Sequence, residues 1–140
     1  MNHSKIIIAD DDIDDRDLIE RAFRKLGLAE HLHFAVDGED LMDFLHEKQG
    51  NIGSSIIFLD LNMPRKDGRE ALQEIKTSAA LKKIPVIIFT TSRSKDDIEA
   101  AYATGANCFI SKSNTFPDLV SMLKNAVDFW FETATLPKMI

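Results

Sequence analysis

Apolar residues follow two patterns that alternate along the chain and predict strands and helices in turn. Short apolar runs rich in β-branched and aromatic residues are too short for ordinary helices, so they predict strands buried on both faces. These runs occupy positions 5–10, 31–36, 56–59, 86–90 and 107–111. Between them, apolar residues recur every three or four positions, which predicts helices with one apolar face. The helical stretches are marked by residues 14–26, 41–45, 71–75, 95–104 and 116–132.

This alternation predicts an α/β fold. Strand and helix units joined by short turns predict one doubly wound, five-stranded parallel sheet with helices on both faces, because right-handed crossovers leave few other topologies. The 140 residues suffice for one domain with a sizeable core. We therefore expect a domain over residues 1–132, a C-terminal extension over residues 133–140 and no separate output domain.

Composition and charge narrow the classes of partner. The net charge of −6 and the pI near 5.1 argue against a nucleic-acid surface, which needs clustered Lys and Arg. Apolar runs of about five residues are far below the roughly 20 needed to span a bilayer, and no signal-peptide hydrophobic region precedes the first strand. We therefore expect a cytoplasmic protein with no nucleic-acid or membrane partner. The single Cys108 excludes an internal disulfide.

Polar residues that could take part in catalysis or metal binding stand at the ends of four of the predicted strands. They are Asp10, Asp11 and Asp12 after the first strand, Asp60 after the third, Thr90 at the end of the fourth and Lys112 after the fifth. In a parallel sheet all the carboxyl ends lie on the same edge, where α/β proteins form their ligand crevices. We therefore expect these side chains to gather at one site.

Two carboxylates at this edge favour a metal site. At about 4 Å and an effective dielectric of about 20, two like charges repel by about 4 kcal/mol, so Asp11 beside Asp60 needs a neutralising cation. Oxygen ligands in small number favour Mg²⁺, which keeps several of its waters. We expect Asp11 and Asp60 to bind the ion directly, Asp10 to hold it through water, and the backbone carbonyl of Asn62 to complete the protein ligands.

A simpler interpretation of the acidic cluster is helix capping. Asp is a favoured N-cap residue, and carboxylates interact well with the positive end of a helix. We expect this role, or simple solvation, for Asp12, Asp14 and Asp15. For Asp10 and Asp11 the presence of Asp60 and Lys112 favours the metal site instead.

A carboxylate beside Mg²⁺, a hydroxyl group and an ammonium group together indicate phosphoryl transfer. The carboxylate of Asp60 is the candidate nucleophile, which makes it the phosphoacceptor. Thr90 offers a hydroxyl donor to the phosphoryl oxygens. Lys112 supplies a compact positive charge as negative charge spreads over the transferred group.

These motifs resemble those of the receiver domain of two-component response regulators, from Lys5 to about Glu132. The resemblance rests on the acidic cluster after strand one, on Asp60 with Pro64 and Gly68, and on Thr90 and Lys112. It implies the flavodoxin-like (βα)5 fold, with Asp60 accepting phosphate from the phosphohistidine of a sensor histidine kinase and Mg²⁺ as cofactor. It also implies that Thr90 acts as a switch with an aromatic residue on strand five, here Phe109.

The chain is most similar to the single-domain response regulators that work with bacterial phytochromes. The motifs concerned are Asp67-Gly68-Arg69-Glu70, Thr90-Thr91-Ser92, Lys112-Ser113 and Phe129-Trp130-Phe131-Glu132-Thr133. The resemblance implies a bacteriophytochrome as the kinase. Ser113 departs from the wider family, in which proline commonly follows the lysine, so the peptide geometry at Lys112-Ser113 stays open.

The last helix and the tail carry more apolar residues than one helix face can bury. Beyond the core-facing stripe we expect Val120, Phe129 and Phe131 to point elsewhere. The tail adds Leu136, Pro137, Met139 and Ile140 to this apolar surface. The tail either folds back over its own sheet edge or joins the last helix in a symmetric dimer. We favour the homodimer.

Two other functions use the same residues. An aspartyl-phosphate phosphohydrolase would need a general acid near the nucleophile and a substrate lid, and Asn62 is a poor acid. A degenerate receiver would act only as a dimerising adaptor. The intact acidic set favours the phosphorylatable receiver, which is not a conventional enzyme although it supplies groups to its own phosphorylation and dephosphorylation.

Overall fold

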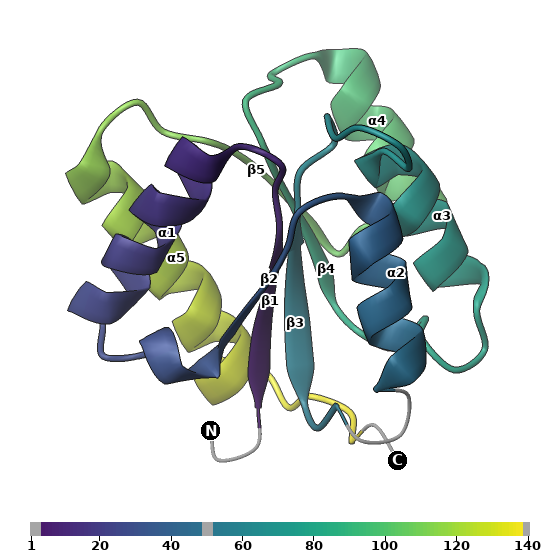
Figure 1. The fold of residues 1–140 in the computed structure, drawn as a ribbon, viewed down its shortest axis with the longest axis horizontal. Coiled ribbons are helices and arrows are strands. Elements are labelled where there is room, and N and C mark those ends of the chain that lie inside the picture. Colours follow the sequence, from purple (N-terminus) through teal and green to yellow (C-terminus); the bar gives the residue numbers. More distant parts are fainter. Residues whose placement is uncertain (1–3, 49–51, 139–140) are drawn as a thin grey trace.

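The computed structural model describes residues 4–48 and 52–138, and over these residues five strands form one parallel sheet. The strands are β1 (Lys5–Ala9), β2 (Leu32–Ala35), β3 (Ser55–Leu59), β4 (Val86–Thr90) and β5 (Cys108–Ser111). Their order is β2-β1-β3-β4-β5. Each neighbouring pair is parallel, so every strand has its carboxyl end at the same edge of the sheet, the upper edge in Figure 1.

Helices cover both faces of this sheet, which confirms the doubly wound α/β prediction (Figure 1). One face carries α1 (Ile13–Lys25) and α5 (Phe116–Asp128), and the other carries α2 (Gly38–Glu47), α3 (Gly68–Thr77) and α4 (Lys95–Thr104). Two short elements follow α1 and α5, the 3₁₀-helix η1 (Ala29–His31) and the π-helix η2 (Phe129–Thr133).

The core has two halves because side chains of a strand alternate between the two faces of a sheet. Every residue of β3 and β4 is buried, as a central parallel strand requires. In β3, Ile57 and Leu59 pack with α2, α3 and α4, while Ile56 and Phe58 pack with α1 and α5. The rings of Phe58 and Phe89 meet edge to face on the second side, with centroids 5.8 Å apart.

The observed boundaries differ from the predicted ones by one residue at an end of four strands. β1 ends at Ala9, β3 begins at Ser55 and β5 begins at Cys108. β2 is shortened to Leu32–Ala35, and η1 forms directly before it. The helix α1 begins at Ile13 because the side chain of Asp12 caps it and accepts hydrogen bonds from Asp14 N and Asp15 N. These shifts leave the number and order of the elements unchanged.

The prediction of one continuous α-helix over 116–132 is wrong at its end. After Asp128 the backbone widens into the π-helix η2, and Ala134 N donates to Phe129 O at 2.7 Å. This change of pitch re-aims the side chains that follow it. Phe131, which we expected to point away from the core, packs partly against it, as does Trp130. The same expectation is wrong for Val120, which lies within α5 before this change and also packs partly against the core. Phe129 alone of these stays half exposed, at 50%.

The described part of the tail folds back beneath the amino-terminal edge of its own sheet (Figure 1). Leu136 packs against the core half of α1 and α5, and Ser54 Oγ donates to Pro137 O at 3.4 Å. Residues 134–138 therefore cover their own sheet edge, one of the two alternatives considered from the sequence. Met139 and Ile140 lie outside the described residues.

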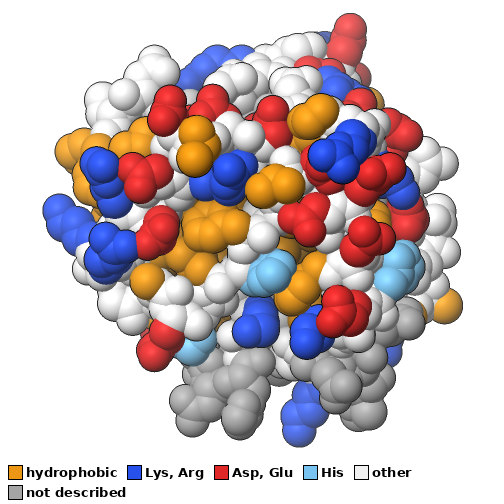
Figure 2. All heavy atoms as spheres, viewed as in Figure 1, with side chains coloured by type: hydrophobic (Ala, Val, Ile, Leu, Met, Phe, Trp, Pro, Cys, Tyr) orange, Lys and Arg blue, Asp and Glu red, His pale blue; other side chains and the backbone are white. Residues whose placement is uncertain are grey.

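In residues 4–48 and 52–138 no helix has both the length and the apolar character that crossing a membrane requires. On the face in Figure 2, Lys and Arg side chains alternate with Asp and Glu. This face therefore presents no continuous basic surface of the kind that binds nucleic-acid phosphates.

Close backbone contacts fix the starts of two helices near the carboxyl edge. A Cβ at Gly38, the first residue of α2, would lie 2.1 Å from Lys66 O, and Gly38 N donates to the same oxygen at 2.9 Å. A Cβ at Gly68, the first residue of α3, would lie 2.0 Å from Asp60 O. Only glycine lets these helix starts approach the loop after β3 so closely.

We expect Gly38→Ala to lower the free energy of unfolding by about 2–3 kcal/mol, because the added methyl group forces Lys66 and α2 apart. Gly27→Ala is the matched control. Gly27 has no atom within 4 Å of an added Cβ but has a φ of +75°, so this variant tests backbone strain alone. It should cost about 1 kcal/mol. Urea unfolding measures both variants, and an equal cost for the two would contradict the close-contact explanation.

Candidate functional site

The ladder of the parallel sheet continues past the strand ends and places the candidate residues. Asp10 N donates to Ala35 O at 3.0 Å, and Asp60 N donates to Ala9 O at 3.0 Å. Lys112 N likewise donates to Thr90 O at 2.7 Å. Each residue after a strand is therefore fixed to the neighbouring strand. The sequence prediction that these side chains share one edge is confirmed by their contacts.

Asp60 is the centre of the site. Its side chain is only 10% exposed, and three donors from three segments reach it. Thr90 Oγ1 donates to Asp60 Oδ1 at 3.0 Å, Asn62 N donates to the same oxygen at 3.2 Å, and Lys112 Nζ donates to Oδ2 at 3.1 Å. These bonds fix the rotamer of the carboxylate.

Lys112 binds three carboxylates at once. Its Nζ lies 2.6 Å from Asp10 Oδ2, 2.9 Å from Asp15 Oδ2 and 3.1 Å from Asp60 Oδ2. It also lies 5.8 Å from the centroid of the Phe89 ring. Burial disfavours the charged form, but the hydrogen bond and charge of Asp10 outweigh it, so the pKa of Lys112 lies above its ordinary value. The ammonium is therefore a fixed positive charge at neutral pH.

Asp10 is the most buried acid of the cluster, with a side chain 2% exposed. Burial raises the pKa of its carboxyl above the ordinary value, and the hydrogen bond from Lys112 offsets only part of that rise. Its Oδ2 contacts Lys112, and its Oδ1 accepts from Asp12 N at 2.9 Å. Both carboxylate oxygens therefore have protein donors, and Arg16 Nη1 donates to the Asp10 carbonyl at 2.7 Å.

The carboxylates of Asp10, Asp11 and Asp60 could hold a metal ion together. One oxygen of each lies within 4.8 Å of the others, and Asp11 is exposed at the mouth while the other two are buried. At this separation each pair of charges repels by about 3 kcal/mol at an effective dielectric of about 20. Counting Asp15, four carboxylates face one ammonium group, so three negative charges remain. The donor set fits a divalent cation that prefers oxygen ligands.

Asp15 is a site residue that the sequence interpretation missed. We expected solvation or capping, but the side chain reaches Lys112 from the first turn of α1. The helical spacing carried a usable signal. Asp15 stands four residues before buried Ile19 and seven before buried Ala22, so it lies on the stripe of α1 that faces the sheet. Asp12, in contrast, is the predicted cap.

The two predicted switch residues occupy neighbouring strands. Thr90 is fully buried beside Asp60, and Phe109 packs partly against the core half formed with α2, α3 and α4. The backbone N–H of Phe109 donates to the hydroxyl oxygen of Tyr102 on α4 at 3.1 Å.

No cis peptide bond occurs in residues 4–48 and 52–138, so Lys112-Ser113 is trans.

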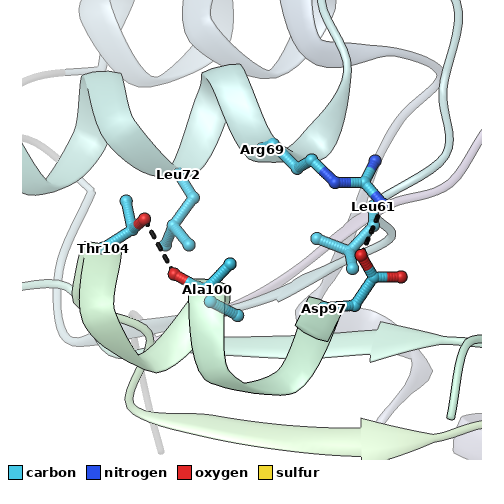
Figure 3. A pocket seen from close by; sticks show the side chains of 7 residues that line it. Leu61, Arg69, Leu72, Asp97, Ala100 and Thr104 are labelled. Carbon is cyan, nitrogen blue, oxygen red and sulfur yellow. Dashed lines mark hydrogen bonds and ion pairs between the residues drawn. The ribbon is translucent and has the colours of Figure 1, made fainter. Parts of the chain in front are cut away.

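Polar contacts link the loop after Thr90 to two helices. Ser111 Oγ donates to Ser92 O at 2.9 Å, and Ser92 Oγ donates to Asp97 Oδ2 at 2.7 Å. Arg69 Nη2 of α3 donates to Asp97 Oδ1 at 3.1 Å, closing one end of a small hollow of about 80 Å³ between α3 and α4 (Figure 3). The hydrogen bonds from Ser92 and Arg69 hold the pKa of Asp97 below its usual value. α4 is therefore coupled to the loop beside the carboxylates.

Comparison with known proteins gives one consistent result. The sequence profile of the response regulator receiver domain matches residues 6–124. The chain is 40% identical over 136 residues to response regulator Rcp1 of Synechocystis sp., covering 94% of this chain and 92% of that protein.

Solved structures agree with this. The phosphorylated cyanobacterial phytochrome response regulator RcpA has a TM-score of 0.84 and 39% identity, covering 95% of this chain and 97% of its own. The Mn²⁺-bound form of Rcp1 has a TM-score of 0.78 and 38% identity, covering 95% and 99%.

We expect a divalent cation to stabilise the fold through Asp11. An ion that binds only the folded state at about 100 times its Kd adds about 2.7 kcal/mol to the free energy of unfolding. Urea unfolding with and without MgCl₂ should show this gain in the parent protein and its near-complete loss in Asp11→Asn. Without the ion, Asp11→Asn should be as stable as the parent or more stable, because it removes a repulsive charge.

Asp14→Asn is the matched control, since Asp14 is an exposed carboxylate in the first turn of α1, three residues after Asp11. It should keep the gain from MgCl₂. An equal loss of that gain in both variants would mean that the ion acts through general screening and not through a site at Asp11.

Proposed function

Since this chain belongs to the response regulator receiver domain family, we propose that it accepts a phosphoryl group on Asp60 from the phosphohistidine of a sensor histidine kinase and passes on the signal by a change of conformation. The observation that carries this proposal is the convergence of Thr90, Asn62 N and Lys112 on one largely buried carboxylate. Sites that activate a nucleophile hold it in this way.

The proposed reaction uses the groups already in place. An oxygen of Asp60 attacks phosphorus, an O–P bond forms, the N–P bond of phosphohistidine breaks, and the imidazole leaves with the electron pair. The ammonium of Lys112 stabilises the negative charge that develops on the phosphoryl oxygens. The Thr90 hydroxyl, now bonded to Asp60, can turn its donor to one of those oxygens.

Mg²⁺ is the cofactor of this proposal. Asp11 and Asp60 would bind it directly, Asp10 through water, and the carbonyl oxygen of Asn62 would complete the protein ligands. The indirect role of Asp10 is supported by its deeper burial, since its side chain is 2% exposed and that of Asp60 is 10% exposed. When bound, the ion neutralises charge on the carboxylates and the phosphoryl group. The similar protein Rcp1 has been solved in a Mn²⁺-bound form, which supports a divalent ion as the cofactor, and the carboxylates of Asp10, Asp11 and Asp60 support its position.

Removal of the phosphoryl group needs only water. A water molecule attacks phosphorus, the bond to Asp60 breaks, the carboxylate leaves with the electron pair, and inorganic phosphate and a proton are released. The amide of Asn62 is a poor acid for a faster, enzyme-like cleavage. The protein is thus proposed as a phosphoacceptor that supplies catalytic groups to its own reactions, without turnover of a separate substrate.

The signal would leave the site through Thr90. When its hydroxyl moves toward a phosphoryl oxygen, it pulls the loop that follows Thr90. Ser92 in this loop is hydrogen-bonded to Asp97, so the movement reaches α4. The space left by Thr90 admits rotation of Phe109 on the adjacent strand, and the Tyr102 contact links this residue to α4. The surface of the last two βα units would then change for a partner.

The phytochrome link and the domain organisation belong to the same proposal. Similarity to Rcp1 and RcpA supports a bacteriophytochrome as the kinase. Residues 1–132 would form the receiver and residues 133–140 a C-terminal extension. A cytoplasmic location is part of the proposal, because the receiver must meet the kinase's phosphohistidine.

We expect a phosphodonor to add one phosphoryl group to the parent protein and none to Asp60→Asn, because Asp60 is the carboxylate that Thr90, Asn62 N and Lys112 contact. Purified protein is incubated with MgCl₂ and acetyl phosphate, or with a phosphorylated kinase, and its intact mass is measured. Lys112→Gln should be phosphorylated on the order of 100-fold more slowly, as for loss of a charge-stabilising group.

The mass measurement, together with an assay of aryl phosphate hydrolysis, separates the rival functions. A protein that stays unmodified under all donors would be a degenerate adaptor. A protein that hydrolyses aryl phosphates with many turnovers would be a phosphohydrolase. Addition of a phosphoryl group to Asp60→Asn at the parent's stoichiometry would show that the acceptor is another residue.

A homodimer through the last helix completes the proposal. Phe129 is half exposed after the end of α5, Phe116, Val120 and Ala126 of α5 are only partly buried, and β5 lies at the edge of the sheet. Isologous pairing through α5 and its end would bury apolar surface that these side chains still expose. Because residues 134–138 cover their own sheet edge, the helix supports the dimer better than the tail does.

We expect Phe129→Asp to shift a dimer to monomers, because it places a charge in the proposed interface. Sedimentation velocity measures the mass in solution. Val36→Asp is the matched control, since Val36 is 44% exposed and follows β2 at the opposite edge of the sheet. A dimer that survives Phe129→Asp unchanged would exclude this helix as the interface.

A further inference from the structure

Every donor of the Lys112 ammonium is already in use. An ammonium group has three N–H donors, and Nζ has three carboxylate partners, Asp10 at 2.6 Å, Asp15 at 2.9 Å and Asp60 at 3.1 Å. A phosphoryl oxygen that arrives at Asp60 also needs the ammonium. One existing partner must then give up its hydrogen bond.

The three partners differ in what release would cost them. The Asp10 side chain is 2% exposed, the Asp60 side chain 10% and the Asp15 side chain 35%. Lys112 must stay beside Asp60, because the phosphoryl group is attached there, so the choice lies between Asp10 and Asp15. A buried carboxylate that loses its cation is hydrated less than a partly exposed one, so its release costs more. Asp15 also stands in the first turn of α1, where the helix dipole stabilises a negative charge without the help of Lys112. Release of Asp15 therefore costs least.

We infer that Asp15 is a positioning residue that occupies the third donor of Lys112 in the resting state and yields it to the incoming phosphoryl oxygen. The inference rests on the proposed phosphorylation of Asp60 and deepens it. Asp15 does not touch the reacting atoms. It keeps the ammonium on the α1 side of the site, and it sets a barrier that phosphorylation must overcome.

The space beside this contact permits the exchange. Asp15 and Lys112 line a small surface hollow of about 40 Å³ together with Leu18, Phe89 and Ser113. Ile19, one turn further along α1, is 2% exposed and fixes the helix to the core. The side chain of Asp15 can therefore turn away from Lys112 into water while the backbone of α1 stays in place.

The exchange leaves the chemistry of phosphorylation unchanged. With acetyl phosphate as donor, an oxygen of Asp60 forms a bond to phosphorus, the bond between phosphorus and the acetyl oxygen breaks, and acetate leaves with the electron pair. Before transfer Lys112 donates to Asp10, Asp15 and Asp60. After transfer it donates to a phosphoryl oxygen in place of Asp15.

The test compares phosphorylation rate with Mg²⁺ affinity in the full chain. Asp15→Asn should raise the rate constant with acetyl phosphate at saturating MgCl₂ by about 3- to 10-fold, which corresponds to a barrier lowered by about 1 kcal/mol. The same variant should bind Mg²⁺ by calorimetry about 2-fold more weakly, because one nearby negative charge is lost. A change of folding alone would not move these two quantities in opposite directions.

Three further variants assign the effect to the contact. Asp15→Glu, which restores a carboxylate, should return the rate toward that of the parent. Asp14→Asn, which removes an exposed charge from the same turn, should keep the parent rate within about 2-fold. In a Lys112→Gln background Asp15→Asn should change the rate less than about 2-fold, because the partner is gone.

The outcomes separate this inference from the proposed function. A rate in Asp15→Asn equal to or below that of a phosphorylatable parent would overturn the role of Asp15 and leave phosphorylation of Asp60 intact. The same acceleration in Asp14→Asn would also overturn it, because general charge would then be the cause. A parent protein that takes no phosphoryl group would instead overturn the proposed function, and the inference with it.

Discussion

One ammonium group makes this site possible. Asp10, Asp11, Asp15 and Asp60 would repel one another strongly at the edge of the sheet, and Lys112 bonds to three of the four. It offsets one charge and leaves an excess of three, which makes the site receptive to a divalent cation. The contacts of Lys112 thus hold the carboxylates together, and the negative charge that remains favours the binding of an ion.

The fold supplies the rigidity that this arrangement needs. Asp10, Asp60 and Lys112 each extend a parallel ladder by one hydrogen bond beyond the strand, so their backbones move only if the sheet does. The fully buried residues of β3 and β4 resist such movement. In contrast, the loop after Thr90 is held by side-chain contacts through Ser92 and Asp97, which exchange partners at lower cost. Rigid strands beside a loop whose side-chain contacts can exchange partners are suited to a conformational switch.

Sequence reasoning worked best where the chemistry is carried by the backbone pattern. The alternation of strands and helices fixed which residues share an edge, and so Asp10, Asp60, Thr90 and Lys112 were placed together correctly. It failed where the outcome depends on side-chain reach. The contact of Asp15 with Lys112 spans 97 positions in the chain. The π-helix over Phe129–Thr133 is a change of backbone pitch that local propensity does not describe.

Local patterns in the sequence are enough to predict the order of the elements, the parallel sheet and the residue types at its carboxyl edge, because short apolar runs and a 3.6-residue period are local information. Tertiary structure alone decided which carboxylates share the Lys112 ammonium, that the last helix widens after Asp128, and that residues 134–138 return to their own sheet edge. Those outcomes depend on distances between segments far apart in the chain. Such distances are set only when the two halves of the core are packed.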